Sequence, residues 1–253
     1  MDLLKGLSYT LFLSILLSGI VPAQDHPYGT GTWDANSLGN HRIVLQVDDQ
    51  ADAVLADIPW RRRDSDPERK RLIVIDEATG DQIKNVVAAR ITRERGEVVF
   101  QPRTVPGRYH VYYLPHRLTG RSNYPTTEYL EPVETAAEDW LDRNGLRGAS
   151  RSVHSLPKAE VLEFQAIDKL NSFFPMEIVA FESEVDSKLS QNQKPYLLFP
   201  EDRTNPIRMQ SELPHKWVKR GPLNAFSTTA SRGEFLAFQV GVYAARQRLE
   251  GLK

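Results

Sequence analysis

The chain has 253 residues, 40% of them hydrophobic and 26% charged, a composition typical of a globular protein with a sizeable core. Its formal net charge of −1 gives no broad field to attract nucleic acid or anionic lipid, so we expect no nucleic-acid partner. The absence of cysteine excludes disulfides, thiolate metal sites and a cysteine nucleophile.

Residues 1–23 have the pattern of a signal peptide. Lys5 supplies the positive start, an apolar run follows over residues 7–20, and small residues precede a cleavage point after Ala23. The alternative is a membrane anchor, but the run is shorter than the roughly 20 residues of a bilayer span. We therefore expect an exported protein, secreted or periplasmic, with no membrane span in the mature chain.

Short apolar segments at a spacing of about ten residues predict that the protein is mainly β, with a β-sandwich domain over residues 24–131. Turn residues separate these segments, including the hairpin turn 93–96. The expected strands lie within residues 41–47, 53–58, 71–76, 83–91, 97–101 and 109–114.

The pattern then changes to helical spacing, which predicts a short helical connector over residues 132–192. The expected helices are 132–146 and 158–171, and Ser183 with Asp186 forms a weak capping box for a third.

Residues 193–253 return to β structure and predict a second β-sandwich domain of which only the start is present. The expected strands are 195–199 and 235–243, with short ones possible at 208–209 and 215–218. An incomplete sandwich would expose strand edges and an apolar face, which favours aggregation.

One basic cluster, Trp60-Arg-Arg-Arg-Asp64, is a candidate binding site, because arginine forks match the oxygens of anionic sugars and phosphates. Exposed aromatic rings can also stack on sugars. Trp60, Arg62 and Tyr112 are therefore the candidate glycan contacts. The alternative is a charged loop whose arginines pair locally, with most of the aromatic rings in the core.

No residue pattern indicates a catalytic, metal or cofactor site, and we predict none. Glycosidases need two carboxyl groups about 5 Å or about 6.5–9.5 Å apart across one bond. The pairs Glu138-Asp139 and Glu201-Asp202 are adjacent in sequence, and neighbours on a strand point to opposite faces. A salt-bridged turn is the simpler reading of Glu201 and Asp202.

Several segments together resemble the N-terminal region of secreted glycoside hydrolases of family 123. They include the stretches 57–64, 73–76, 98–102, 106–115, 173–177 and 196–203, followed by Leu213-Pro-His-Lys-Trp217 and the segment 233–243. The resemblance extends over nearly all of the mature chain.

The resemblance implies β-sandwich material in front of a (β/α)₈ barrel. It also implies action on glycans that contain N-acetylhexosamine, with the substrate's acetamido group as nucleophile. The two catalytic carboxylates of this family belong to the barrel, and no position here matches them. We therefore expect a chain that lacks the barrel, is inactive alone and has the barrel, in cis or in trans, and a glycan as its partners. The alternatives are a stand-alone carbohydrate-binding module and a structural protein.

Overall fold

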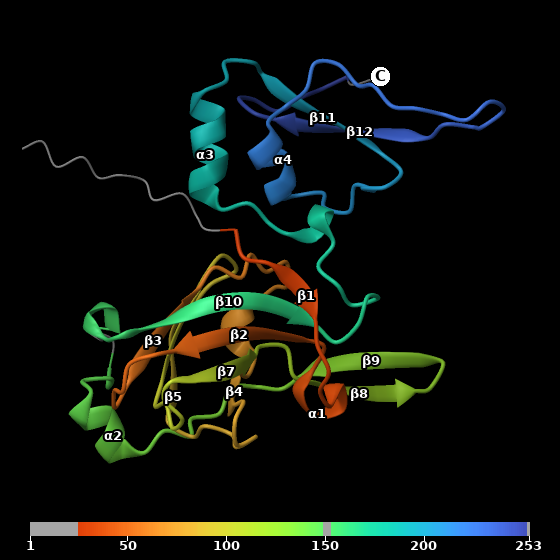
Figure 1. Cartoon of the computed structure of the whole chain (residues 1–253). Helices are drawn as coiled ribbons and strands as arrows, with labels where there is room; N and C mark the ends of the chain where they lie inside the picture. Colours follow the sequence, from red (N-terminus) through yellow and green to blue (C-terminus); the bar gives the residue numbers. More distant parts are fainter. Residues whose placement is uncertain (1–24, 149–152, 252–253) are drawn as a thin grey trace, which may run out of the picture.

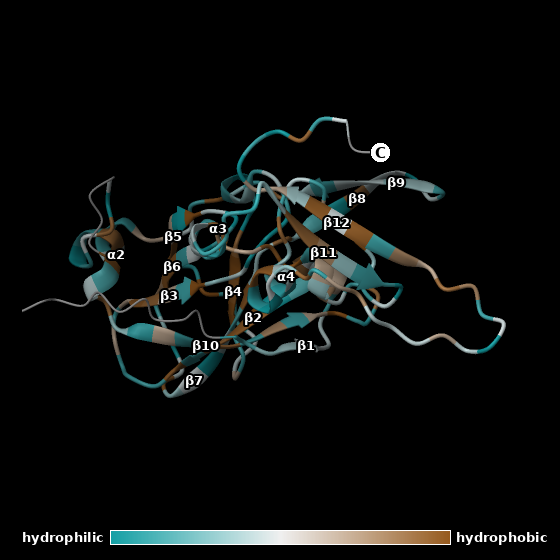
Figure 2. Cartoon of the chain, turned by 90° about the horizontal axis from the view of Figure 1, so that it is seen from above, coloured by the Kyte–Doolittle hydropathy of each residue, from teal (hydrophilic) through white to brown (hydrophobic). Residues whose placement is uncertain are grey.

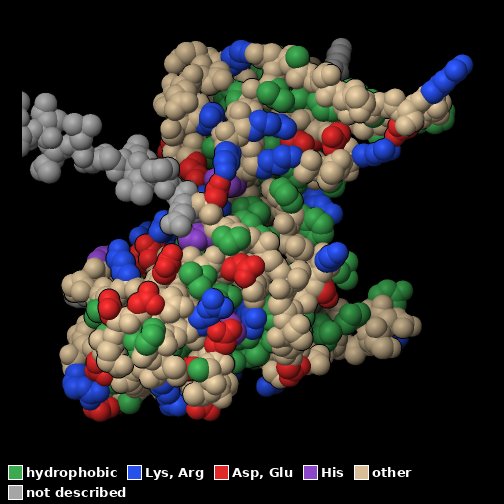
Figure 3. Space-filling model, viewed as in Figure 1, with side chains coloured by type: hydrophobic (Ala, Val, Ile, Leu, Met, Phe, Trp, Pro, Cys, Tyr) green, Lys and Arg blue, Asp and Glu red, His purple; other side chains and the backbone are tan. Residues whose placement is uncertain are grey.

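The computed structural model describes residues 25–148 and 153–251. The expected leader and its cleavage point at Ala23 lie outside these residues. The chain forms two lobes, a larger β lobe of residues 25–171 and a smaller C-terminal lobe of residues 172–251 (Figures 1 and 3). The prediction of a mainly β protein is confirmed.

One eight-stranded sheet forms the β lobe. Neighbours are antiparallel except where β10 runs parallel to β1 and β3. The order is β4 (Ile73–Asp76), β7 (Gly107–Tyr112), β2 (His41–Val47), β10 (Lys158–Ala166), β3 (Val54–Ile58), β6 (Gly96–Phe100) and β5 (Val86–Ile91), and β1 (Tyr28–Thr30) adds to β10.

The sheet curls on itself because β10 pairs with different neighbours along its length. Its first residues pair with β3 and the rest with β2 and β1, and the register shifts between Val161 and Glu163. A bulge of this kind bends a strand and increases its twist. The two halves of the sheet therefore face each other across one core, as in a sandwich.

Strand β3 is apolar at nearly every position because both of its faces are covered. Val54, Ala56 and Ile58 lie in the central core. Leu55 faces the other way and packs with Trp140 of helix α2 (Glu138–Arg143) in a second cluster. The remaining elements of the lobe are α1 (Ala35–Leu38), η1 (Pro67–Arg69), η2 (Val153–Ser155) and a hairpin of β8 (His116–Arg121) and β9 (Tyr124–Tyr129).

The sequence prediction was wrong about residues 158–171. Strand β10 occupies Lys158–Ala166 where a helix was expected, so the segment 132–192 is not a purely helical connector. Ala159, Val161, Phe164 and Ala166 are buried, because their spacing of two is interrupted only by the bulge. Helix α2 confirms a helix within residues 132–146.

The C-terminal lobe contains a two-stranded sheet, β11 (Tyr196–Asp202) with β12 (Phe238–Ala244), that packs on helices α3 (Glu182–Ser190) and α4 (His215–Arg220). The single turn η3 (Pro175–Glu177) leads into this lobe. Both expected strands are present, but residues 215–218 are helical and not a strand, and residues 208–209 are in no strand. The stacked rings of Phe199 and Trp217, 4.6 Å between centroids, mark the core of the lobe.

Helix α3 begins one residue before the expected capping box. Phe181 is its N-cap, and the backbone N–H of Phe181 donates to the carboxylate of Glu184 at 2.9 Å. The box is therefore not formed by Ser183 and Asp186. Glu184 takes the acidic position of the box, and its carboxylate also pairs with Arg61 of the β lobe.

Candidate functional site

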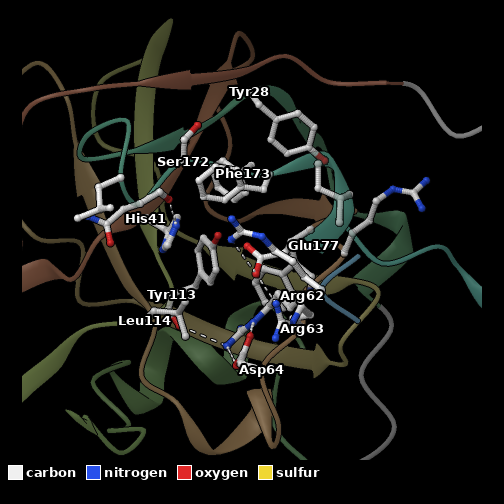
Figure 4. Close-up of a pocket in the computed structure, with 17 residues that line it drawn as sticks. Tyr28, His41, Arg62, Arg63, Asp64, Tyr113, Leu114, Ser172, Phe173 and Glu177 are labelled. Carbon is white, nitrogen blue, oxygen red and sulfur yellow. Dashed lines mark hydrogen bonds and ion pairs between the residues drawn. The ribbon is translucent and has the colours of Figure 1, made fainter. Parts of the chain in front are cut away.

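The candidate site is a cavity of about 370 Å³ where the two lobes meet (Figure 4). The loop after β3 and the end of β7 form its floor, β1 and β2 contribute one wall, and residues 170–178 the other. The residues that line it are Tyr28, His41, Trp60, Arg61, Arg62, Arg63, Asp64, Tyr113, Leu114, Leu170, Asn171, Ser172, Phe173, Phe174, Glu177, Ile178 and Arg208.

The three consecutive arginines of the loop after β3, with Arg61 and Arg62 on the floor and Arg63 at the rim, pair with three different carboxylates. Arg61 donates to both oxygens of Glu184 at 2.7 Å, Arg62 donates to both oxygens of Asp64 at 2.8 and 2.7 Å, and Arg63 pairs with Glu177 at 2.5 Å. The alternative interpretation of the sequence was that these arginines pair locally, and only Arg62 does so. Arg61 and Arg63 connect the β lobe to the C-terminal lobe.

Arg61 separates the directions of the three side chains because its backbone lies in the left-handed region, with φ of 49°. Non-glycine residues rarely adopt this conformation, and it costs of order 1 kcal/mol. The guanidinium lies 3.7 Å from the centroid of the Phe181 ring, and its two hydrogen bonds to Glu184 offset the strain. The loop is thereby held in one geometry.

Arg62 is a buried cation. Its guanidinium lies over the rings of Trp60 and Tyr113, at 4.7 and 5.0 Å from their centroids, and its Nη1 has no hydrogen-bond partner among the described residues. Asp64 also accepts from Lys70 at 2.5 Å. Burial raises the pKa of Asp64, but the hydrogen bonds from Arg62 and Lys70 outweigh it and leave the pKa below its usual value. Asp64 is therefore charged at neutral pH.

Trp60 and Arg62, two of the three candidate glycan contacts, lie together in this cavity, but only 3% and 4% of their surfaces are exposed. The indole N–H of Trp60 donates to the carbonyl of Thr92 at 2.8 Å, and a Cβ on Gly96 would lie 2.3 Å from its ring. The close fit gives Trp60 a role in the core of the floor.

Tyr112, the third candidate, lies away from the cavity because successive residues of a strand point to opposite faces. Its hydroxyl accepts a hydrogen bond from Arg42 at 3.2 Å, and its ring meets Trp33 edge-on. Its neighbour Tyr113 lines the cavity instead, with the hydroxyl end toward Phe173 (Figure 4).

Sequence reasoning missed most of the cavity wall, although Phe173 and Glu177 lay in a segment that carried the family resemblance. Phe173 packs against Tyr28 and His41 with centroids 5.0 Å from each. His41 Nε2 donates to the carbonyl of Asn171 at 2.8 Å. Burial lowers the pKa of His41, so its ring is neutral at pH 7, and burial raises the pKa of Tyr28 to about 12. This wall is therefore aromatic and uncharged.

The rim of the cavity carries two guanidinium groups and one carboxylate. Glu177 accepts from Arg63 at 2.5 Å and lies 3.6 Å from Arg208. The guanidinium of Arg208 also lies 4.3 Å from the centroid of the Phe174 ring. These side chains are partly exposed, whereas Arg61 and Arg62 are buried.

The adjacent carboxylate pairs singled out in the sequence lie outside the cavity, and Glu201, Glu138 and Asp139 form ion pairs. Glu201 is buried and accepts from the indole of Trp217 at 2.8 Å, with Arg220 at 2.8 Å and Lys216 at 3.2 Å. Glu138 and Asp139 lie on the surface of α2 beside arginines. No three His, Asp or Glu side chains gather as metal ligands within residues 25–148 and 153–251.

No helix in these same ranges is long and apolar enough to cross a membrane. No curated protein and no solved structure shows a significant match to the chain. A family model does match, the N-terminal domain of glycoside hydrolase 123, over residues 31–167. The match spans β2 to β10, so it covers the curled sheet except for β1 and continues past the expected boundary at residue 131. Because it takes in more than half of the chain, the protein belongs to the glycoside hydrolase 123 N-terminal domain family.

Proposed function

We propose that this chain is the non-catalytic N-terminal region of a secreted family 123 hydrolase that acts on glycans containing N-acetylhexosamine. The family match over the curled sheet supports this proposal. Its partner would be the catalytic domain of that hydrolase, in cis or in trans, to which the two lobes contribute a rigid support. The leader pattern of residues 1–23 favours export to the periplasm or the outside of the cell.

The single observation that carries the non-catalytic role is the state of Glu201, a carboxylate that is only 3% exposed. Its oxygens face Trp217, Arg220 and Lys216, so both are used in hydrogen bonds and ion pairs. A general acid must reach the reacting atoms of the substrate. Glu201 has two cations beside it and is closed off from solvent, which suits a structural carboxylate.

The test is an assay of the purified chain with an aryl β-N-acetylgalactosaminide, alongside the variants Glu201→Gln and Asp202→Asn. We expect no release of the aryl group above the rate in buffer for any of the three. Turnover by the natural chain that disappears in either variant would contradict the proposal. Turnover equal in all three proteins would indicate a contaminating hydrolase, which a further purification step identifies.

A stand-alone carbohydrate-binding role is the second candidate, because the cavity between the lobes combines aromatic rings with arginines. Sugar-binding sites need an apolar ring face and a few polar groups that fix orientation. If binding of glycans persists in the isolated chain while no catalytic partner associates with it, this second role replaces the first.

A further inference from the structure

The cavity between the lobes is large enough for a small ligand and chemically divided into two sides. Its volume of about 370 Å³ falls in the range of known small-molecule pockets, roughly 300–1,000 Å³. Phe173 and Tyr28 give it an apolar side, and Arg63 and Arg208 give it a positive rim. A ligand that fits must therefore present both an apolar face and a group that accepts hydrogen bonds.

The charge on the rim is not balanced. Arg63 and Arg208 share one carboxylate, that of Glu177, so two guanidinium groups face a single negative charge. Their side chains are 44% and 40% exposed, so a ligand can reach them. Guanidinium forks bind carboxylates through paired hydrogen bonds, which a neutral sugar hydroxyl cannot reproduce. The unbalanced rim favours an anionic ligand.

The interior of the cavity suits a sugar ring better than a bare anion. Tyr113 is only 3% exposed, but the part of it that faces the cavity is its hydroxyl end, which is directed at Phe173 and has no hydrogen bond within the described residues (Figure 4). Tyr28 is 39% exposed and packs against Phe173, so the two rings form an accessible apolar surface. A pyranose has one apolar C–H face and several hydroxyl groups, and these match the ring surface and the phenol.

We propose that this cavity binds a sugar unit that carries a carboxylate, that is, a hexuronate of a glycan chain. The carboxylate lies between Arg63 and Arg208, the pyranose ring lies against Phe173 and Tyr28, and a sugar hydroxyl bonds to Tyr113. The inference goes beyond the proposed function, because it concerns binding by this chain alone and holds whether or not a catalytic domain associates with it.

The experiment is calorimetric titration, with saturation-transfer NMR, of the purified chain with methyl β-glucuronide. Methyl β-glucoside has the same ring without the carboxylate, and acetate has the carboxylate without the ring. We expect binding of the glucuronide in the millimolar range or tighter and at least about tenfold weaker binding of the two control ligands. The glucuronide affinity should also fall as sodium chloride is raised, because the rim is exposed.

Two variants test the assigned contacts. Arg208→Gln removes a partly exposed cation and should weaken glucuronide binding about tenfold or more, while Tyr113→Phe removes only a hydroxyl and should weaken it several-fold. Arg203→Gln is the matched control, because Arg203 is 70% exposed and pairs with Glu234 away from the cavity. It should bind like the natural chain.

Each other outcome overturns the proposal. Equal affinity for glucoside and glucuronide identifies a neutral-sugar site, and equal affinity for acetate identifies a simple anion site. If no glucuronide binding is detected at millimolar concentrations, the proposed site is ruled out. If a folded Arg208→Gln variant binds the glucuronide as tightly as the natural chain, the assigned carboxylate contact is ruled out. None of these results bears on aryl-glycoside turnover, so failure here is distinct from failure of the proposed non-catalytic role.

Discussion

His110 is a buried histidine of the β lobe whose surroundings oppose its charged form. Burial, together with the positive charges of Arg42 and Arg108, lowers the pKa of His110 to about 4. Arg42 Nη1 donates to Nδ1 at 3.2 Å, so the ring proton is on Nε2, which lies 3.4 Å from Glu77. Glu77 raises the pKa but does not outweigh burial. The ring is therefore neutral in the folded protein over the whole physiological range.

This neutral histidine predicts a loss of stability as the pH falls. The pKa is about 4 when folded and 6.5 when unfolded, so the unfolded chain takes up a proton first between these values. We expect the free energy of unfolding to lose about 2 kcal/mol from this group between pH 7.5 and 4.5. In His110→Gln, urea unfolding should show a smaller loss over that interval.

The control for this measurement is His154→Gln, which removes an exposed histidine of the short turn η2. It should keep the pH dependence of the natural chain. A His110→Gln variant with an unchanged slope between pH 7.5 and 4.5 would show that the ring is not held neutral.

At the scale of elements, the short strands were predictable from sequence and strand β10 was not. β2, β3 and β6 are runs of β-branched residues between turns, and that local pattern was sufficient. In β10 the bulge between Val161 and Glu163 shifts the buried set by one residue. The shifted pattern imitates the spacing of a helix face, and only pairing with three distant strands makes it extended. The extended conformation of β10 therefore depends on tertiary contacts, which the local sequence does not show.

The candidate site, too, was only partly predictable from local sequence. The loop Trp60–Asp64 was found from sequence because its charges are consecutive. Phe173 and Arg208 meet that loop only through the fold of the C-terminal lobe, which no local pattern specifies. The sequence also could not show that Arg61 turns to helix α3 while Arg62 turns inward, since this depends on one backbone angle.

An ion pair between Arg61 and Glu184 joins the loop after β3 to helix α3. Glu184 also accepts from the backbone of Phe181 and lies 3.3 Å from His215. Burial raises the pKa of Glu184, but the bonds from Arg61, His215 and Phe181 outweigh it, and the pKa lies well below its usual value. The pair thus stabilises the fold above the pKa of an unfolded glutamate, near 4.3, and that contribution is lost as the pH falls.

Replacing Glu184 by Gln should cost about 2 kcal/mol at pH 7, because it leaves the buried guanidinium of Arg61 without a counter-charge. Urea denaturation measures the cost, and hydrogen exchange should show faster opening of α3 than of the β lobe. Asp186→Asn makes the same change of charge at an exposed position of the same helix and should alter stability by less than about 0.5 kcal/mol. Equal effects of the two variants would contradict a specific role for the pair.

At the scale of the whole molecule, one surface is apolar without a cover among the described residues, the outer face of the β11–β12 sheet. Gly241 faces inward, where a Cβ would lie 2.2 Å from Trp217. Alternation then turns Phe238, Val240 and Val242 outward, and they are 55%, 47% and 44% exposed. Figure 2 shows this hydrophobic stretch along β12, and β11 is the only described neighbour of the strand.

An apolar face beside an open strand edge favours association between copies of the chain. We expect the purified chain to self-associate as its concentration rises, as the sequence also predicted. The double variant Val240→Thr with Val242→Thr keeps β-branched shapes on the strand and adds a polar atom at each position. It should therefore remain more nearly monomeric at the same concentration in analytical ultracentrifugation.

The control that gives this measurement its meaning is Leu118→Thr, because Leu118 is 63% exposed but lies on the β8–β9 hairpin of the other lobe. A single exposed apolar side chain is common on protein surfaces, so this variant should sediment like the natural chain. If the double variant, like the control, leaves the association unchanged, the β12 face is not the surface that joins the copies. If both variants reduce it equally, general surface hydrophobicity is responsible. Only a selective effect at Val240 and Val242 assigns the association to this sheet, where an additional strand or a second β layer would bury the same side chains.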